Sequence, residues 1–238
     1  MALPKFNYPT TLIENPSNKK KYTFRPMLVK DEKLLLMAKA SEVTTDILSA
    51  IKQVVSNCVL DNDLDVDTFP LYVLEYLFIK LRAFSVGDKI NVSYRDFEDN
   101  KLYEFEIDLS AVKIRAPEET YDNKVIIEGK SGIVLRYPSA HLYDDKNFLE
   151  SEGEDSFYKL VGKCIDQIFD EDTVYPTDDI SEEELYNFVE MIDVKSFDKI
   201  REFITHIPTL YYKLEYKNSL GNAKVIELTT LSDFFTLR

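Results

Sequence analysis

The spacing of the apolar residues changes along this chain, and this change of period constrains the fold more than any other feature. Apolar residues recur at helical spacing over 47–59 and 71–84, and Gly87 then provides a stop signal. Over 90–94 and 103–109 they alternate with polar residues, which indicates two antiparallel strands joined by a turn. Because helical and strand patterns are segregated, the sequence predicts an α+β fold in which amphipathic helices pack on small antiparallel hairpins.

Other segments of the first two thirds of the chain follow the same logic. A hairpin is expected over 10–26, with its turn at 15–18, and a helix over 30–40. Two short strands are expected at 125–127 and 133–135. Residues 157–169 carry Leu, Val, Ile and Phe at helical spacing, so a single helix is predicted there.

The last third repeats the order of a helix followed by a hairpin. Ser181 and Glu184 have the spacing of a capping box, which predicts a helix N-terminus. A further helix should end at Pro208, and strands at 212–216 and 225–228 then form a last hairpin. This order suggests that a unit of helix and hairpin occurs twice in the chain. We expect an N-terminal α+β domain over 1–137, an acidic loop or linker over 138–155, and a C-terminal helical region with its hairpin over 156–238.

The charge of the chain is concentrated in one segment. With 29 basic and 43 acidic side chains among 238 residues, the formal net charge is -14, and residues 144–184 hold 15 of the acids against three lysines. Nucleic acid is an unsuitable partner, because its affinity comes from Lys and Arg that displace counterions. The segment is interpreted either as a solvated face or as a docking surface for a basic partner. The docking candidates are Glu150, Glu152, Glu154, Asp155, Asp170, Glu171 and Asp172.

Two cysteines indicate the compartment. Cys58 and Cys164 each occupy an apolar position of a predicted helix, which is typical of buried thiols in a reducing environment. No run of residues approaches the roughly 18 apolar residues that a membrane span requires. A protein of the cytosol, without a membrane partner, is therefore expected.

The acidic string from Asp61 to Asp67 places carboxylates at alternate positions, as a calcium loop does. The position that requires glycine is Val66, however, and the twelfth position, which needs a bidentate acid, is Tyr72. The sequence therefore predicts an acidic entry to a helix and no metal site.

Catalytic signatures are also missing from the pattern. The chain has two histidines, His141 and His206, and neither lies near a cysteine or a G-x-S-x-G serine. We therefore expect a protein that is not an enzyme and uses no cofactor. The alternative is an enzyme that uses an acidic pair, with a divalent cation held by Asp61, Asp63 and Asp65. A third hypothesis, an acidic mimic of nucleic acid, requires charge spread over a long surface.

Four stretches of the sequence carry a resemblance to a known family: Lys21–Ala38, Leu74–Gly87, Phe197–Phe203 and Ile226–Phe235. They resemble the baseplate hub subunits and hub assembly proteins of T-even-like bacteriophages with contractile tails. The second and fourth are the more specific. Similar proteins carry a Cys-x-x-Cys-Gly turn in the last hairpin, whereas this chain has Lys217–Gly221, so no metal is expected at that turn.

The resemblance implies a protein that builds, or helps to build, the centre of the tail baseplate by binding other hub proteins, without catalysis. It implies expression in the host cytoplasm during assembly, with two versions of the role: an assembly factor that leaves, or a structural subunit retained in the virion. The acidic segment favours the assembly factor, while the sequence leaves the homo-oligomeric state open. Five residues are predicted either to contact partners or to serve internal packing: Glu75, Tyr76, Arg82, Phe234 and Phe235.

Overall fold

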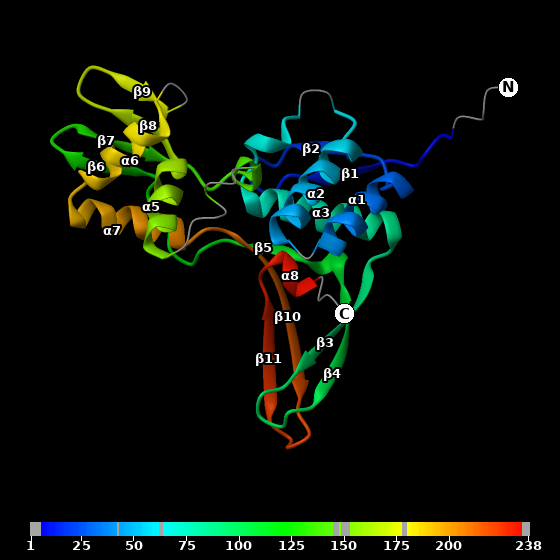
Figure 1. Cartoon of the computed structure of the whole chain (residues 1–238). Helices are drawn as coiled ribbons and strands as arrows, with labels where there is room; N and C mark the ends of the chain where they lie inside the picture. The colour runs from blue at the N-terminus through cyan, green and yellow to red at the C-terminus, as the bar shows by residue number, and fades with distance from the viewer. Residues whose placement is uncertain are drawn as a thin grey trace. The chain divides into compact units, whose positions relative to one another are not determined.

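The computed structural model describes residues 6–234, apart from 42, 62–63, 145–147, 149–152 and 178–179. The chain forms two compact units (Figure 1), of which the first contains 1–115 and 209–238 and the second 116–208. Helices and small antiparallel sheets make up both units, so the α+β class is confirmed.

The division into units differs from the expected domain boundaries at 137 and 155. The chain leaves the first unit after Arg115 and returns to it at Thr209, because the strand that begins there pairs with the strand that ends at Arg115. This antiparallel pairing joins residues that lie about a hundred positions apart. A scan of local periodicity does not detect such a pairing, since it depends on contacts distant in sequence.

Three helices form the body of the first unit, and a hairpin packs beside them. Helix α3 is buried on most of its circumference, because Tyr72, Val73, Leu74, Leu77 and Phe78 are all buried. A helix that is apolar nearly all round belongs in a core, and α3 has this role here. The elements are β1 (Thr11–Glu14), β2 (Lys21–Phe24), α1 (Val29–Ser41), α2 (Thr44–Cys58), the 3₁₀ turn η1 (Val66–Thr68) and α3 (Leu71–Val86).

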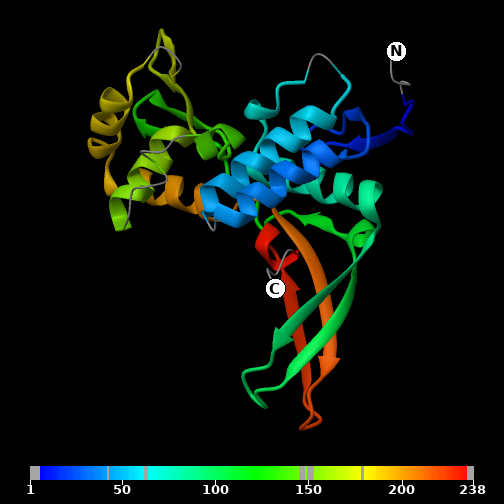
Figure 2. The same cartoon turned by 45° about the vertical axis from the view of Figure 1, so that its right-hand side comes forward.

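Two long hairpins extend from the helices of the first unit and run side by side in both views (Figures 1 and 2). The strand β10 connects its own hairpin to the body, since its first residues pair with β5 and the rest pair with β11. We refer to the two hairpins together as the arm. The elements are β3 (Lys89–Arg95), β4 (Leu102–Asp108), η2 (Leu109–Ala111), β5 (Lys113–Arg115), β10 (Thr209–Lys217), β11 (Ala223–Leu228) and α8 (Leu231–Phe234).

The second unit is a four-stranded antiparallel sheet in the order β6-β7-β8-β9, with helices on one face. Its core joins Val125 and Ile133 of the sheet to Val161, Ile200 and Phe203 of the helices. The elements are β6 (Lys124–Glu128), β7 (Ser131–Leu135), η3 (Ala140–Asp144), α5 (Gly153–Cys164), β8 (Ile165–Phe169), β9 (Val174–Pro176), α6 (Glu182–Glu190) and α7 (Val194–Thr205).

The single helix predicted over 157–169 is wrong in its second half. The helix α5 ends at Cys164, and Ile165–Phe169 forms the strand β8, which pairs with β7 on one side and β9 on the other. Ile and Phe suit a pleated surface as well as a helix, so the apolar spacing was ambiguous there. Pairing with the apolar strand β7 decides in favour of the strand.

Several local predictions are confirmed. Cys58 and Cys164 are free and buried, and burial raises the pKa of each thiol to about 12. At the start of α6 the Ser181 hydroxyl accepts from the Glu184 amide, and the Glu184 carboxylate accepts from the Ser181 amide. Helix then hairpin occurs twice in chain order, as α3 with β3 and β4, and as α7 with β10 and β11. No helix in the described part of the chain is both long and apolar enough to cross a bilayer.

Candidate functional site

The candidate residue Glu75 lies on α3 and is largely buried. Burial is the main reason that its pKa rises to about 7, and the negative charge of Asp233 on α8 adds to the shift. Among the described residues, Glu75 forms no hydrogen bond or ion pair. A largely buried carboxyl group favours its neutral form, so Glu75 is protonated in an appreciable fraction of molecules near neutral pH.

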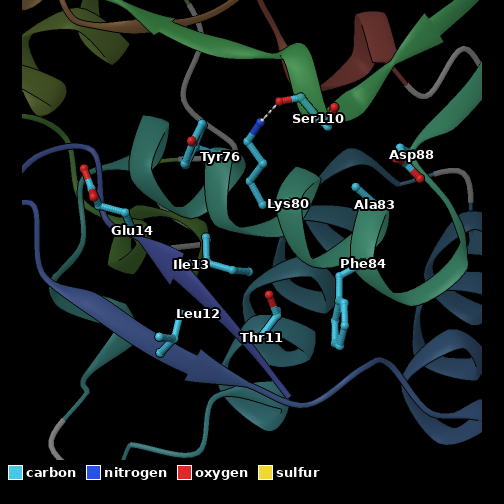
Figure 3. A pocket seen from close by; sticks show the side chains of 10 residues that line it. All are labelled: Thr11, Leu12, Ile13, Glu14, Tyr76, Lys80, Ala83, Phe84, Asp88 and Ser110. Carbon is cyan, nitrogen blue, oxygen red and sulfur yellow. Dashed lines mark hydrogen bonds between the residues drawn. The ribbon is translucent and has the colours of Figure 1, made fainter. Parts of the chain in front are cut away.

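Tyr76 lies one residue further on α3 and lines a surface hollow of about 500 Å³ between β1 and α3 (Figure 3). The Lys80 ammonium lies 5.1 Å from the centre of the Tyr76 ring. The same ammonium donates to the carbonyl oxygens of Leu109, Ser110 and Val112, at 3.2, 2.6 and 2.8 Å. Lys80 thus holds the 3₁₀ turn η2 and the residue after it against α3. Because the Lys80 ammonium donates to three backbone carbonyl oxygens, we assign it a structural role in the wall of the hollow.

Two of the other predicted contact residues, Arg82 and Phe234, interact with other parts of the first unit. Arg82 donates to the carbonyl oxygen of Gly87 at 3.5 Å, and burial lowers its pKa. Phe234 on α8 is 2% exposed, so its ring lies within the core of the first unit. Phe235 lies outside the described residues. Whether any of these side chains contacts a partner stays a prediction.

The tips of the two arm hairpins are joined by a dense polar network that no local sequence pattern indicates. The Tyr216 hydroxyl on β10 donates to Asp96 at 2.5 Å. The amide groups of Asn218 and Asn222 both donate to Glu98, at 2.8 and 2.6 Å. These bonds connect the turn after β3 to the turn after β10, which are about 120 residues apart in sequence.

Asp99 adds a second group of bonds to the same junction. Its carboxylate accepts from the Ser219 amide at 3.0 Å, from the Ser219 hydroxyl at 2.8 Å and from the Tyr103 hydroxyl at 2.5 Å. Although desolvation acts to raise it, these donors hold the pKa of Asp99 well below its usual range. Charge-assisted hydrogen bonds of this kind fix the relative position of the two turns.

Aromatic rings on β3, β4 and β10 pack together next to this polar network. The Tyr216 ring lies 5.0 Å from that of Tyr103, 5.3 Å from that of Phe105 and 6.5 Å from that of Tyr94, measured between ring centres. Tyr94, Tyr103 and Phe105 all belong to the β3–β4 hairpin, whereas Tyr216 belongs to β10, so this cluster of four rings joins the two hairpins. Such tilted and edge-to-face pairs stabilise the stack of the two hairpins beyond simple burial.

The fixed tip presents apolar side chains to solvent. Phe97, in the turn after β3, is 92% exposed, and Leu220, in the turn after β10, is 62% exposed. Leu102 and Val225 on the adjoining strands are also exposed. A rigid support with an exposed aromatic ring has the properties of a binding hot spot, because little entropy is lost when a partner covers it. We call Phe97, Leu102, Leu220 and Val225 the arm tip.

The predicted acidic docking residues fall into two groups. Asp170, Glu171 and Asp172 form the exposed turn between β8 and β9. The Asp170 carboxylate accepts from the amides of Asp172 and Thr173, and Glu171 lies 3.3 Å from the Lys130 ammonium. Glu150 and Glu152 lie outside the described residues, and the side chains of Glu154 and Asp155 are not described.

The net charge belongs entirely to the second unit. Residues 116–208 contain 23 acidic and 9 basic side chains, while the first unit contains 20 of each. One unit of the chain is therefore neutral with an apolar arm tip, and the other carries the full charge of -14.

The acidic string before α3 has separate structural uses. Asp61 accepts from the Thr23 amide at 2.5 Å, Asp65 caps η1, and Asp67 pairs with Lys52 at 3.0 Å. Asp63 lies outside the described residues. Within the described ranges, no group of three or more His, Cys, Asp or Glu side chains is placed to hold a metal ion.

An α+β fold with a rigid, apolar arm tip has the character of a protein that binds other proteins. The family model described as T4 bacteriophage base plate protein matches residues 6–236, which is nearly the whole chain. The chain belongs to this family and is a phage baseplate protein. No curated protein and no solved structure matches it.

Proposed function

We propose that this baseplate protein is a non-enzymatic assembly protein of the tail baseplate hub, which binds other hub proteins during tail morphogenesis. The arm tip is the observation that supports this role most strongly. Phe97 and Leu220 lie in turns that the bonds around Asp96, Glu98 and Asp99 hold together, and both side chains are mostly exposed, although the Phe97 ring also makes an edge-to-face contact with Tyr94 at 6.2 Å between ring centres. Exposed apolar groups on a fixed support are typical of protein interfaces.

The acidic second unit favours a transient role. A partner attracted by charge associates rapidly, and its binding weakens as the salt concentration rises, which suits an assembly factor in the host cytoplasm. The alternative, a structural subunit retained in the virion, uses the same arm tip for a permanent contact. The acidic-pair enzyme is a weaker proposal, because the carboxylates of Asp61, Asp65 and Asp67 already serve separate local roles.

Quantitative mass spectrometry separates these roles. Purified phage particles are compared with hub precursors captured from infected cells with this protein as bait. Recovery of hub precursors together with absence from particles supports the assembly factor. A fixed copy number in particles supports the retained subunit. Recovery in neither would contradict the proposed function.

A further inference from the structure

The sheet of the second unit has one face on the helices and a second face with a row of apolar residues. Strand register places Ile126 beside Gly132, Gly132 beside Phe169, and Phe169 beside Val174, so the row crosses all four strands. We call these four residues the sheet row. Neighbouring positions in register point to the same side of a sheet, so the row lies opposite the face that carries Val125 and Ile133.

The sheet row is apolar and open at both ends. Ile126 is 44% exposed and Val174 is 56% exposed. Between them, the Phe169 ring lies over Gly132, because a Cβ atom at that glycine would be 2.9 Å from Phe169 Cζ. The glycine therefore lets the ring lie against the backbone. Four strands at about 4.8 Å spacing give a strip on the order of 14 Å wide, which fits an extended or helical segment of one partner.

Acidic residues border the end of this row. Asp170, Glu171 and Asp172 follow Phe169 directly and precede Val174, and all three are exposed. The pKa of Asp170 is lowered by bonds from the Asp172 amide, the Tyr175 hydroxyl and the Thr173 amide. Two lysines also lie here: Lys124 is 4.5 Å from the Phe169 ring centre, and Lys130 pairs with Glu171. The surrounding unit has 23 acids and 9 bases.

We propose that the sheet row is a docking site for a basic amphipathic segment of another protein, with apolar side chains on the row and Lys or Arg against the acidic turn. Charge complementarity selects this occupant, since a unit with a net charge of -14 attracts cationic segments over distances near the Debye length. A second copy of the chain would bring an equally acidic unit, and the repulsion disfavours self-association through this face. That the segment belongs to a baseplate protein rests on the proposed function.

The test uses the full chain and two short synthetic peptides, one alternating Leu with Lys and one alternating Ser with Lys. Fluorescence anisotropy measures binding. We expect the Leu–Lys peptide to bind more tightly than the Ser–Lys peptide, and its affinity to fall about tenfold between about 50 mM and about 500 mM salt. The double variant Glu171→Lys/Asp172→Lys should weaken binding by about tenfold. The variant Ile126→Ser/Val174→Ser should bind the Leu–Lys peptide only as weakly as the wild type binds the Ser–Lys peptide.

A matched charge control lies on α6 of the same unit. Glu183→Lys/Glu190→Lys changes the same number of charges at exposed positions away from the row, and it should leave most of the affinity intact. Circular dichroism verifies that each variant is folded. Equal losses in the two charge-reversal variants, or equal affinity for the two peptides, would overturn the proposal.

Two further outcomes are distinguished. Self-association of the wild-type chain that Ile126→Ser/Val174→Ser abolishes, measured by sedimentation, would assign the row to a second copy and overturn the proposal. Capture of baseplate precursors tests the proposed function separately. Peptide binding at the row with no precursor capture would refute the function and leave the docking site in place.

Discussion

Replacing Glu75 by glutamine should remove a pH dependence that this residue imposes on stability. The pKa of Glu75 is raised from 4.5 to about 7 by burial, with a contribution from Asp233. The folded state therefore favours the protonated acid, and the stability gained from it is present below about pH 4.5 and lost as the pH rises through 7. Glutamine is similar in shape and carries no proton to lose.

The magnitude follows from the shift. Between about pH 5 and about pH 8.5, a change of pKa of this size removes about 2.5 kcal/mol from the free energy of unfolding of the wild type. Glu75→Gln lacks this loss, so the difference between the two proteins should change by that amount in favour of the variant as the pH rises.

Urea denaturation at a series of pH values, followed by circular dichroism, provides the assay. Because both proteins share every other titrating group, the difference between their profiles isolates Glu75. Glu190→Gln, at an exposed position of α6, is the control and should run parallel to the wild type. Parallel profiles for Glu75→Gln as well would refute the assignment of Glu75 as a largely buried carboxyl group with a raised pKa.

Three further variants test the packing that supports the surfaces. Arg25→Met leaves the buried Asp31 carboxylate without its cation, now 2.7 Å away, and should cost about 3 kcal/mol in urea denaturation, part of which Asp31→Asn recovers. Lys80→Met removes three bonds to the carbonyls around η2 and should cost about 2 kcal/mol, whereas Lys113→Met at an exposed position should cost less than about 0.5 kcal/mol. Gly132→Ala forces a Cβ atom against the Val125 carbonyl oxygen and the Phe169 ring, and should destabilise the second unit by about 2 kcal/mol or more. Wild-type stability in Arg25→Met, Lys80→Met or Gly132→Ala would contradict the packing described.

Local structure could be predicted from the sequence, because hairpins, helix caps and the burial of the two thiols depend on residues within a few positions of each other. The capping box of Ser181 and Glu184 and the hairpin of β3 and β4 are examples. Contacts distant in sequence were not accessible. The pairing of β5 with β10 sets the unit boundaries, and the strand β8 is decided by its partner β7.

The arm tip shows the same limit at the level of function. Phe97 stands in a polar turn and gives no periodic signal, and the bonds that fix it come from a turn about 120 residues away. The residues chosen from the sequence on α3 lie in a core helix, where burial explains much of their character. Exposure of an apolar residue on a rigid support becomes visible only in three dimensions.

The central claim is that the arm tip binds other baseplate proteins. Hub precursors are captured from infected cells with the wild type, with Phe97→Ser/Leu220→Ser, and with the control Val86→Ser, an exposed apolar position at the end of α3, and are quantified by mass spectrometry. Because these side chains are exposed, all three proteins should be equally stable. We expect the tip variant to lose at least about tenfold in captured precursors while the control captures as the wild type does. Equal capture by the tip variant would contradict the account.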